Sequence, residues 1–315
     1  MSGISTPGAS RDGYGAALMR LSDDARVVVL EADLGKSTKS CHFRDKFPER
    51  TISIGIAEQN MMLVAAGMAT SGYIPFASTF AIFTERAYEQ VRNGIARPNI
   101  PVHICGSHGG IHTGSDGSSA QSIEDLSIYR TLPNMTVIHP CDDYSAEELT
   151  VQLLDHAYPS YTRTVRNNVP RTYTEDSVKN LRIGKGSVLR EGGDVAIIAC
   201  GVLVQEALTA QEELSQRGVE ATVVDMHTLK PFDDSLLTQL AAKCGAVVTA
   251  EDHSIIGGLG SAVAEVLSSQ HPAPLERVGV ADRFGESGGA DELLQMLGMK
   301  SSDIVAAALR CIDRK

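Results

Sequence analysis

Glu58 is the residue whose position most clearly suggests chemistry. The β-branched run at residues 51–54 ends at Gly55, and Glu58 follows it at the start of a small, apolar, helix-forming run. A carboxylate at such a strand-to-helix turn is partly shielded from water and can exchange protons near neutral pH. The alternative is an ordinary acid that the helix dipole favours in the first turn. Position alone favours this second interpretation, so the rest of the chain has to decide.

Other polar and aromatic side chains follow the ends of the predicted strands in the first half of the chain. In parallel α/β sheets the carboxyl ends of the strands lie at one edge, where ligands bind. Each residue alone has a structural explanation, but their convergence on one edge favours a functional site. The residues expected there are Asp33, Glu58, Ser78, Thr79, Phe80, Ser107, His108, His139, Arg163 and Arg166.

A long glycine-rich loop, residues 107–122, follows the predicted strand at residues 101–110 and contains Asp116. Glycines let a backbone approach a ligand closely. The loop has neither the P-loop spacing nor the dinucleotide-binding spacing of glycines, so a nucleotide-phosphate loop is unsupported. The glycines of residues 251–263 also have the wrong spacing for a dinucleotide site, and we interpret them as a tight turn onto a helix.

Stretches with strand-like and helical patterns alternate along the chain, and this alternation indicates the fold class. Strands at residues 27–35, 51–54 and 73–77 alternate with helices at 58–70 and 80–96, and a helix is expected from Ser10 as N-cap. Such alternation predicts mostly parallel sheets with helices on both faces. Periodicity is lost after residue 167 and returns at 194. We therefore predict two consecutive α/β domains, residues 1–172 and 191–315, joined by a linker at 173–190.

Composition excludes several classes of protein. The chain has 315 residues and a net charge of −11 without a basic tract, which argues against a nucleic-acid partner. No apolar run reaches the ~18 residues of a membrane span, and the N-terminus lacks a signal-peptide core. The six cysteines are scattered without a C-x-x-C pair, so buried free thiols are expected rather than disulfides or zinc. A cytoplasmic protein is expected.

Four motifs in order resemble a known family. They are ADLG at residues 32–35, IGIAEQNM at 54–61, STFAIFTERAYEQVRN at 78–93 and SHGGIHTGSDGSSAQSIEDLS at 107–127. Together they resemble the C-terminal half of transketolase, and more closely the small subunit of split transketolases, in which two chains share the enzyme. The resemblance covers nearly the whole chain. It implies a pyrimidine-binding domain followed by a C-terminal transketolase domain.

The resemblance implies thiamine diphosphate as cofactor and transfer of a two-carbon ketol unit from a ketose (phosphate) donor to an aldose-type acceptor. Glu58 matches the glutamate that hydrogen-bonds N1′ of the aminopyrimidine and favours the tautomer that deprotonates the thiazolium C2. Phe83 matches the aromatic residue that stacks on the pyrimidine, and Phe80 is expected to line the same pocket. Asp33 matches a residue near the cofactor at the subunit contact.

The same resemblance implies a sugar site. Arg11, His108 and Arg166 match residues that hold the substrate phosphate, for which guanidinium groups are well suited. Asp116 matches an acid that contacts a donor hydroxyl. One departure is Ala120, which stands where the family has a histidine that contacts the donor. His112, earlier in the same loop, is an alternative source of that imidazole.

A second departure concerns the partner. The G-D-G…N segment that binds the diphosphate and Mg²⁺ in thiamine enzymes is absent, so no metal ligand is expected in this chain. The resemblance therefore implies a separate large subunit that holds both groups, in an α₂β₂ assembly with homodimerising small subunits. Neither the donor and acceptor nor activity without the partner follows from these residues.

Three alternatives stay open. A β subunit of a 2-oxo acid dehydrogenase E1 would deliver acyl groups to a lipoyl domain, whereas Arg11, His108 and Arg166 favour a phosphorylated sugar. A 1-deoxyxylulose-phosphate synthase-like protein normally carries its cofactor-binding domain on the same chain. A non-catalytic regulatory paralogue is favoured by Ala120, but the presence of Glu58 together with the phosphate-type arginines argues against it.

Overall fold

The β-branched and apolar runs of the first half form a seven-stranded sheet in the order β10-β5-β6-β4-β3-β1-β2. The computed structural model describes residues 7–315. All neighbouring strands of this sheet are parallel except β10 and β5. Its strands from the first half are β1 (Val27–Glu31), β2 (Thr51–Ser53), β3 (Ile74–Phe80), β4 (His103–Ser107), β5 (Thr136–Ile138) and β6 (Ser160–Thr164).

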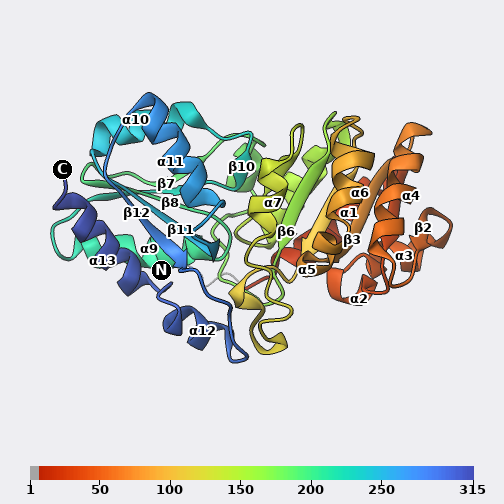
Figure 1. Cartoon of the computed structure of the whole chain (residues 1–315), viewed down its shortest axis with the longest axis horizontal. Helices are drawn as coiled ribbons and strands as arrows, with labels where there is room; N and C mark the ends of the chain where they lie inside the picture. Colours follow the sequence, from red (N-terminus) through yellow and green to blue (C-terminus); the bar gives the residue numbers. More distant parts are fainter. Residues whose placement is uncertain (1–6) are drawn as a thin grey trace.

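Helices surround this sheet (Figure 1). The α-helices are α1 (Ser10–Arg20), α2 (Gly35–Thr38), α3 (Cys41–Lys46), α4 (Glu58–Thr70), α5 (Ala81–Arg86), α6 (Tyr88–Gln90), α7 (Asp125–Thr131) and α8 (Asp143–Val151). Shorter or irregular turns are η1 (Leu21–Asp23), η2 (Pro48–Arg50), the π-helical η3 (Val91–Ala96), η4 (Ile111–Asp116) and η5 (Gln152–Asp155). The strands β1 and β4 to β6 are buried along their whole length, which anchors the residues that follow them.

The second half forms a five-stranded sheet in the order β12-β11-β8-β9-β7, parallel except for β7. Its strands are β7 (Ser187–Arg190), β8 (Val195–Ala199), β9 (Ala221–Asp225), β11 (Val247–Ser254) and β12 (Leu275–Val280). Its helices are α9 (Leu203–Ser215), α10 (Asp234–Cys244), α11 (Leu259–Gln270), α12 (Ala290–Met296) and α13 (Ser301–Ile312). The predicted fold class, two α/β domains with mostly parallel sheets, is confirmed.

Besides the connecting segment, a strand from the second half of the chain joins the two domains. The strand β10 (Thr228–Lys230) comes from the second half but pairs antiparallel with β5 of the first sheet, and it lies between the two domains in Figure 1. The segment expected as a linker, residues 173–190, contains the turn η6 (Ser177–Asn180) and the strand β7. The exact domain boundaries at 172 and 191 stay a prediction.

Two local expectations are wrong. Ser10 is the first residue of α1 rather than its N-cap, which is Ala9, and the Ser10 hydroxyl instead accepts the backbone N–H of Val165 at 2.8 Å. The helix expected at 80–96 begins one residue later, since β3 extends to Phe80, and it is divided into α5, α6 and η3 because the helical hydrogen bonding changes near Ala87 and Val91.

The expectation for the cysteines is confirmed, since all six are free and five of them are buried. The glycines before α11 form a turn onto that helix, as predicted. Within residues 7–315, no helix combines the length and the apolar character needed to cross a membrane.

Candidate active site

The carboxyl ends of β1, β3, β4 and β6 place the predicted residues along one edge of the first sheet. Asp33 follows β1 in a left-handed backbone conformation, and the buried Glu31 accepts the Gly35 N–H at 3.1 Å, which fixes this turn. Phe80 ends β3 and Ser107 ends β4 at the same register, so His108 follows directly beside Phe80. The strand ends thus bring Asp33, Phe80 and His108 to one edge of the sheet.

A pocket of about 180 Å³ opens at this edge. Its lining combines an acid and an aromatic ring with apolar groups and one guanidinium: Ala32, Asp33, Leu34, Ile56, Glu58, Phe83 and Arg86. Three of the predicted cofactor residues, Asp33, Glu58 and Phe83, therefore line one cavity. All of its lining residues belong to the first domain.

Glu58 begins α4, and its side chain is only 1% exposed. Its Oε2 accepts a hydrogen bond from Nη1 of Arg86 at 2.9 Å, and the Arg86 side chain is 52% exposed. The Arg86 guanidinium also lies 5.3 Å from the centre of the Phe83 ring. The pair holds the Glu58 carboxylate toward the pocket while leaving the arginine partly in water.

Sequence reasoning missed Arg86. A signal was present, because Arg86 follows Phe83 by three residues in the same helix, and residues so spaced share a helix face. An arginine in the last turn of a helix has an ordinary structural explanation, which hid its contact with Glu58.

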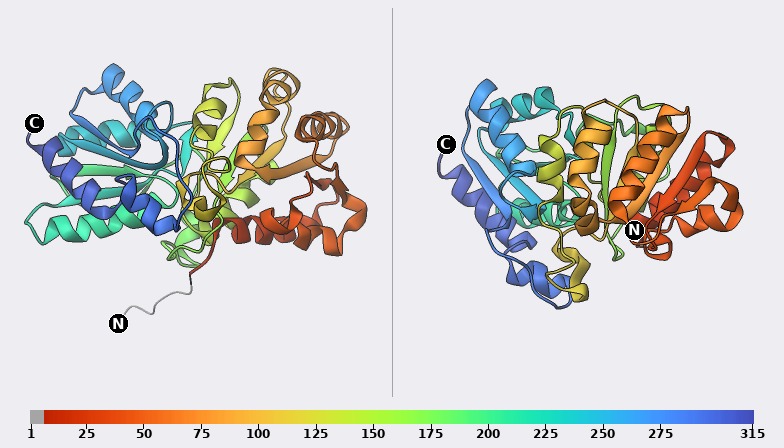
Figure 2. Two further views of the ribbon diagram at one scale, coloured as in Figure 1. Left: turned by 60° about the horizontal axis from the view of Figure 1, so that its bottom comes forward. Right: turned by 45° about the vertical axis from the view of Figure 1, so that its right-hand side comes forward.

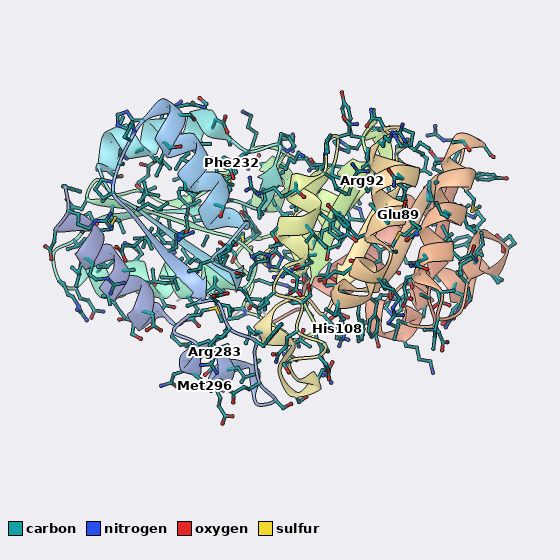
Figure 3. All side chains as sticks on the ribbon, viewed as in Figure 1. Glu89, Arg92, His108, Phe232, Arg283 and Met296 are labelled. Carbon is teal, nitrogen blue, oxygen red and sulfur yellow. The ribbon has the colours of Figure 1, made fainter. Side chains whose placement is uncertain are left out.

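Phe80 connects the pocket to the sugar-site residues. Its ring stacks on Phe83 with centroids 5.6 Å apart and on His108 with centroids 4.0 Å apart. His108 is buried, and its Nδ1 is hydrogen-bonded to the Ser107 hydroxyl at 2.8 Å. Figure 3 shows His108 beside the loop that carries η4. Aromatic faces therefore run continuously from the pocket to the loop.

Burial and neighbouring charge keep the His108 ring neutral. Its pKa is lowered to about 3, mainly by burial and in smaller part by the nearby Arg11 and Arg166. The ring is therefore an uncharged hydrogen-bonding group at neutral pH, and the positive charge of this region comes from the two arginines.

Arg11 and Arg166 lie close enough to influence each other. Burial lowers the pKa of Arg11, the neighbouring Asp12 opposes this, and Arg166 adds to it. Arg11 donates to the Ser37 carbonyl at 3.3 Å, and Arg166 pairs with Asp116 at 2.6 Å. The structure thus brings the four predicted sugar-site residues together: Arg11, His108, Asp116 and Arg166.

Two other residues expected at this edge are buried in the protein, and His112 of the loop has charged neighbours from the second domain. His139 and Arg163 are completely buried, and Arg163 is paired with Asp125 inside the protein. His112 has Asp252, Asp291, Lys300 and Glu206 as its charged neighbours, all from the second domain. Whether His112 supplies the imidazole missing at Ala120 stays a prediction.

Two models of known families match successive parts of the chain. The transketolase pyrimidine-binding domain matches residues 5–172, and the transketolase C-terminal domain matches residues 184–304. The chain belongs to the transketolase family. It is a transketolase-like subunit and hence a transferase, and neither the E1 nor the deoxyxylulose-phosphate synthase alternative is better supported.

Individual relatives agree with this membership. The chain is 43% identical to the 6-deoxy-6-sulfo-D-fructose transketolase subunit SqwH of Clostridium sp. (strain MSTE9), over 97% of this chain and 95% of that protein. A solved split gene transketolase, described as an inactive β4 tetramer, is 47% identical with a TM-score of 0.90, over 98% of this chain and 99% of the other. The transketolase of Campylobacter jejuni subsp. jejuni is 25% identical with a TM-score of 0.82, where 97% of this chain covers 47% of the longer one.

Proposed function

We propose that this chain is the small subunit of a thiamine diphosphate-dependent transketolase-like enzyme. Together with a separate large subunit it would transfer a two-carbon ketol unit from a ketose donor, commonly a phosphate ester, to an aldose-type acceptor. The observation that carries the proposal is the buried Glu58 carboxylate beside the Phe83 ring in a cavity whose edge continues to two arginines.

Family membership implies thiamine diphosphate, and the pocket fits one part of it. A buried acid and a flat aromatic face in about 180 Å³ suit a planar ring with hydrogen-bonding nitrogens, such as the aminopyrimidine. Residues 7–315 contain no group of three acids, histidines or cysteines that could hold a metal ion. The family resemblance assigns the diphosphate and its Mg²⁺ to the large subunit, and we keep that assignment as part of the proposal. When bound, the cofactor supplies an electron sink for the two-carbon fragment.

Within this pocket each residue has one task. Glu58 would share a proton with the pyrimidine N1′, because burial removes water as a competing partner. Phe83 would hold the ring flat, and Asp33 would lie at the rim where the large subunit closes the site. Phe80, which was expected to line the same pocket, is not among its lining residues and would support the Phe83 ring by stacking on it. Arg86 would have to share or release Glu58 when the ring enters.

The sugar end is proposed to bind an anionic group. Arg11 and Arg166 supply positive charge, and the neutral His108 supplies a hydrogen bond. The Asp116 carboxylate would accept a hydrogen bond from a hydroxyl group of the donor sugar. A phosphate ester is the family expectation. A sulfonated sugar is a second candidate, since the relative from Clostridium sp. carries 6-deoxy-6-sulfo-D-fructose in its name and is similar over nearly its whole length. Parallel assays with both sugar types separate these candidates.

The proposed assembly pairs this chain with a large subunit in the cytoplasm, in an α₂β₂ form with homodimerising small subunits. The similarity to a split gene transketolase described as an inactive β4 tetramer supports small subunits that associate with one another. This chain matches only 47% of the length of the Campylobacter jejuni transketolase, which supports a separate partner that supplies the rest of the enzyme.

The test is turnover of Glu58→Gln in complex with the large subunit. We expect the variant complex to bind thiamine diphosphate while its turnover falls at least about 100-fold, the usual range for loss of a proton-transferring group. The control is Glu49→Gln, which changes an exposed glutamate of η2 and should leave turnover unchanged.

Near-normal turnover of Glu58→Gln would disprove the assignment. Lipoyl-dependent acyl transfer without sugar turnover would favour a 2-oxo acid dehydrogenase subunit instead. A regulatory paralogue would show no cofactor binding by isothermal titration, with or without the large subunit.

A further inference from the structure

The loop that carries Asp116 is held by the second domain. Asp252, a completely buried residue of β11, accepts two backbone hydrogen bonds from this loop. Its Oδ1 accepts the Ile111 N–H at 2.7 Å, and its Oδ2 accepts the His112 N–H at 2.9 Å. Both oxygens of one carboxylate thus fix the start of η4, and such charge-assisted bonds are stronger than neutral ones.

The approach of Asp252 to the loop depends on Gly110. This glycine has a φ of 80°, and a Cβ there would lie 2.3 Å from Oδ2 of Asp252. Only glycine combines that backbone conformation with so close a carboxylate. The glycine-rich sequence, which offered no phosphate-binding spacing, is therefore explained here by contact with the second domain.

Arg163 fixes the other end of the loop. Its side chain is 0% exposed and is paired with Asp125 through Nε at 2.9 Å and through Nη2. The same guanidinium donates to the Ser122 carbonyl at 3.0 Å and to the Asp252 carbonyl at 2.5 Å. One buried cation therefore connects the end of the loop with the residue that holds its beginning.

A third contact supports the middle of the loop. Nε2 of Gln121 donates to the Gly114 carbonyl at 3.0 Å and to the Glu286 carbonyl at 2.8 Å. Glu286 belongs to the segment that leads into α12, and both views of Figure 2 show α12 beside the loop that carries η4. Gly117 also lies against this segment, because a Cβ there would meet Ser287 at 2.5 Å.

We propose that Asp252 is a positioning residue that holds Asp116 in place for the donor sugar. Gln121 and Arg163 support the same loop, and we call these three residues the brace. The second domain supplies none of the residues that line the pocket at Glu58. Its contribution to the reaction would be to hold the substrate loop. This inference rests on the proposed function in taking Asp116 as a substrate contact, whereas the hold on the loop itself does not.

The separation of the two regions makes the inference specific. The Asp252 carboxylate is hydrogen-bonded to the loop, and Asp252 is not among the residues that line the pocket. Its loss should therefore weaken the donor contact and leave the cofactor site intact. A change that merely destabilised the whole chain would affect both. The Michaelis constant for the donor and the dissociation constant for thiamine diphosphate therefore have to be measured together.

The experiment uses Asp252→Asn and Gln121→Met, each in complex with the large subunit. Asparagine retains the shape but offers an N–H where the loop needs an acceptor, and methionine removes both hydrogen bonds of Gln121. The matched control is Thr249→Val, another completely buried side chain of β11, whose hydroxyl has no hydrogen-bond partner among residues 7–315. Hydrogen exchange of residues 108–122 reports on the loop directly.

We expect each variant to raise the Michaelis constant for the donor about tenfold, within the range that small misplacements cause. Hydrogen exchange should accelerate in residues 110–117, the cofactor dissociation constant should stay within twofold, and Thr249→Val should match the unmodified complex. Unchanged exchange and an unchanged Michaelis constant in both variants would overturn the inference. A parallel loss of cofactor affinity would overturn it too.

The exchange measurement also separates this inference from the proposed function. Faster loop exchange in Asp252→Asn without any sugar turnover in the unmodified complex would refute the proposed function and leave the brace standing. Normal turnover in the unmodified complex, with unchanged exchange and kinetics in both variants, would refute this inference and leave the proposed function standing.

Discussion

Two arginine–carboxylate pairs, Arg86–Glu58 and Arg163–Asp125, show how differently the two halves of the candidate site are built. The first pair lies within one domain at the open pocket, and its arginine is half exposed. The second pair is completely buried and continues through hydrogen bonds into the other domain. The pocket is thus formed by local elements, α4 and α5, whereas the substrate loop depends on contacts between residues more than a hundred positions apart in the chain, such as Ile111 and Asp252.

The largest expected effect comes from breaking the buried pair. Arg163→Met should lower the free energy of unfolding by about 3–5 kcal/mol, because it leaves Asp125 as an uncompensated buried charge. It also removes the donors to two buried carbonyls. Urea unfolding of the purified chain, followed by circular dichroism, measures this loss. A change below about 1 kcal/mol would show that the buried network contributes little and would remove the contrast with the pocket.

This contrast also explains what the sequence could predict. The helix at Glu58–Thr70 was predicted with its observed bounds, since an apolar helical run after a strand is a local pattern. The rule that parallel strands end at one edge predicts Asp33 and Glu58 together, whereas Phe83 was expected only from the resemblance to the family. The roles of Asp252 and Arg163 could not be predicted, because they depend on how two separate sheets pack against each other.

The irregular parts were missed for a related reason. The short strands β7 and β10 are only four and three residues long, and β10 pairs with the sheet of the other domain. A run of that length carries no periodicity of its own, so tertiary contacts decide its structure. The likeness to the transketolase family supplied the cofactor and the sugar site, which residue patterns alone left open.

Glu85 connects the two regions and gives the second prediction. It lies on α5 between Phe83 and Arg86 in the sequence, and it accepts a hydrogen bond from the Ser122 hydroxyl at the end of the loop at 2.5 Å. Burial raises the pKa of Glu85 to about 8, with the Ser122 hydrogen bond opposing the shift. The carboxyl group is therefore protonated in the folded chain at neutral pH.

The raised pKa of Glu85 determines how the stability of the folded chain changes with pH. Below a pH of about 4.5 the carboxyl group is protonated in both states and has no effect. Between about 4.5 and 8 the unfolded chain releases the proton first, so this group makes stability fall as pH rises, by at most about 1.4 kcal/mol per pH unit. Glu85→Gln should remove that contribution. Urea unfolding at pH 5.5 and 8 should therefore show a larger decrease for the unmodified chain than for the variant, and equal decreases would contradict the buried, protonated state.

The smallest expected effect comes from the pocket pair. Arg86→Met should lower the free energy of unfolding by about 1–2 kcal/mol, because it removes a hydrogen bond to the buried Glu58 carboxylate. The loss should be smaller than for Arg163→Met, since Glu58 lines an open pocket where water can take the place of the half-exposed guanidinium. Arg86→Met is the matched partner of Arg163→Met, with the same substitution and the same type of carboxylate partner. If Arg86→Met destabilised the chain as strongly as Arg163→Met, the Glu58 carboxylate would depend on its guanidinium for folding. Glu58 would then be part of the structural core, and a cofactor ring could not take over its hydrogen bond without destabilising the domain.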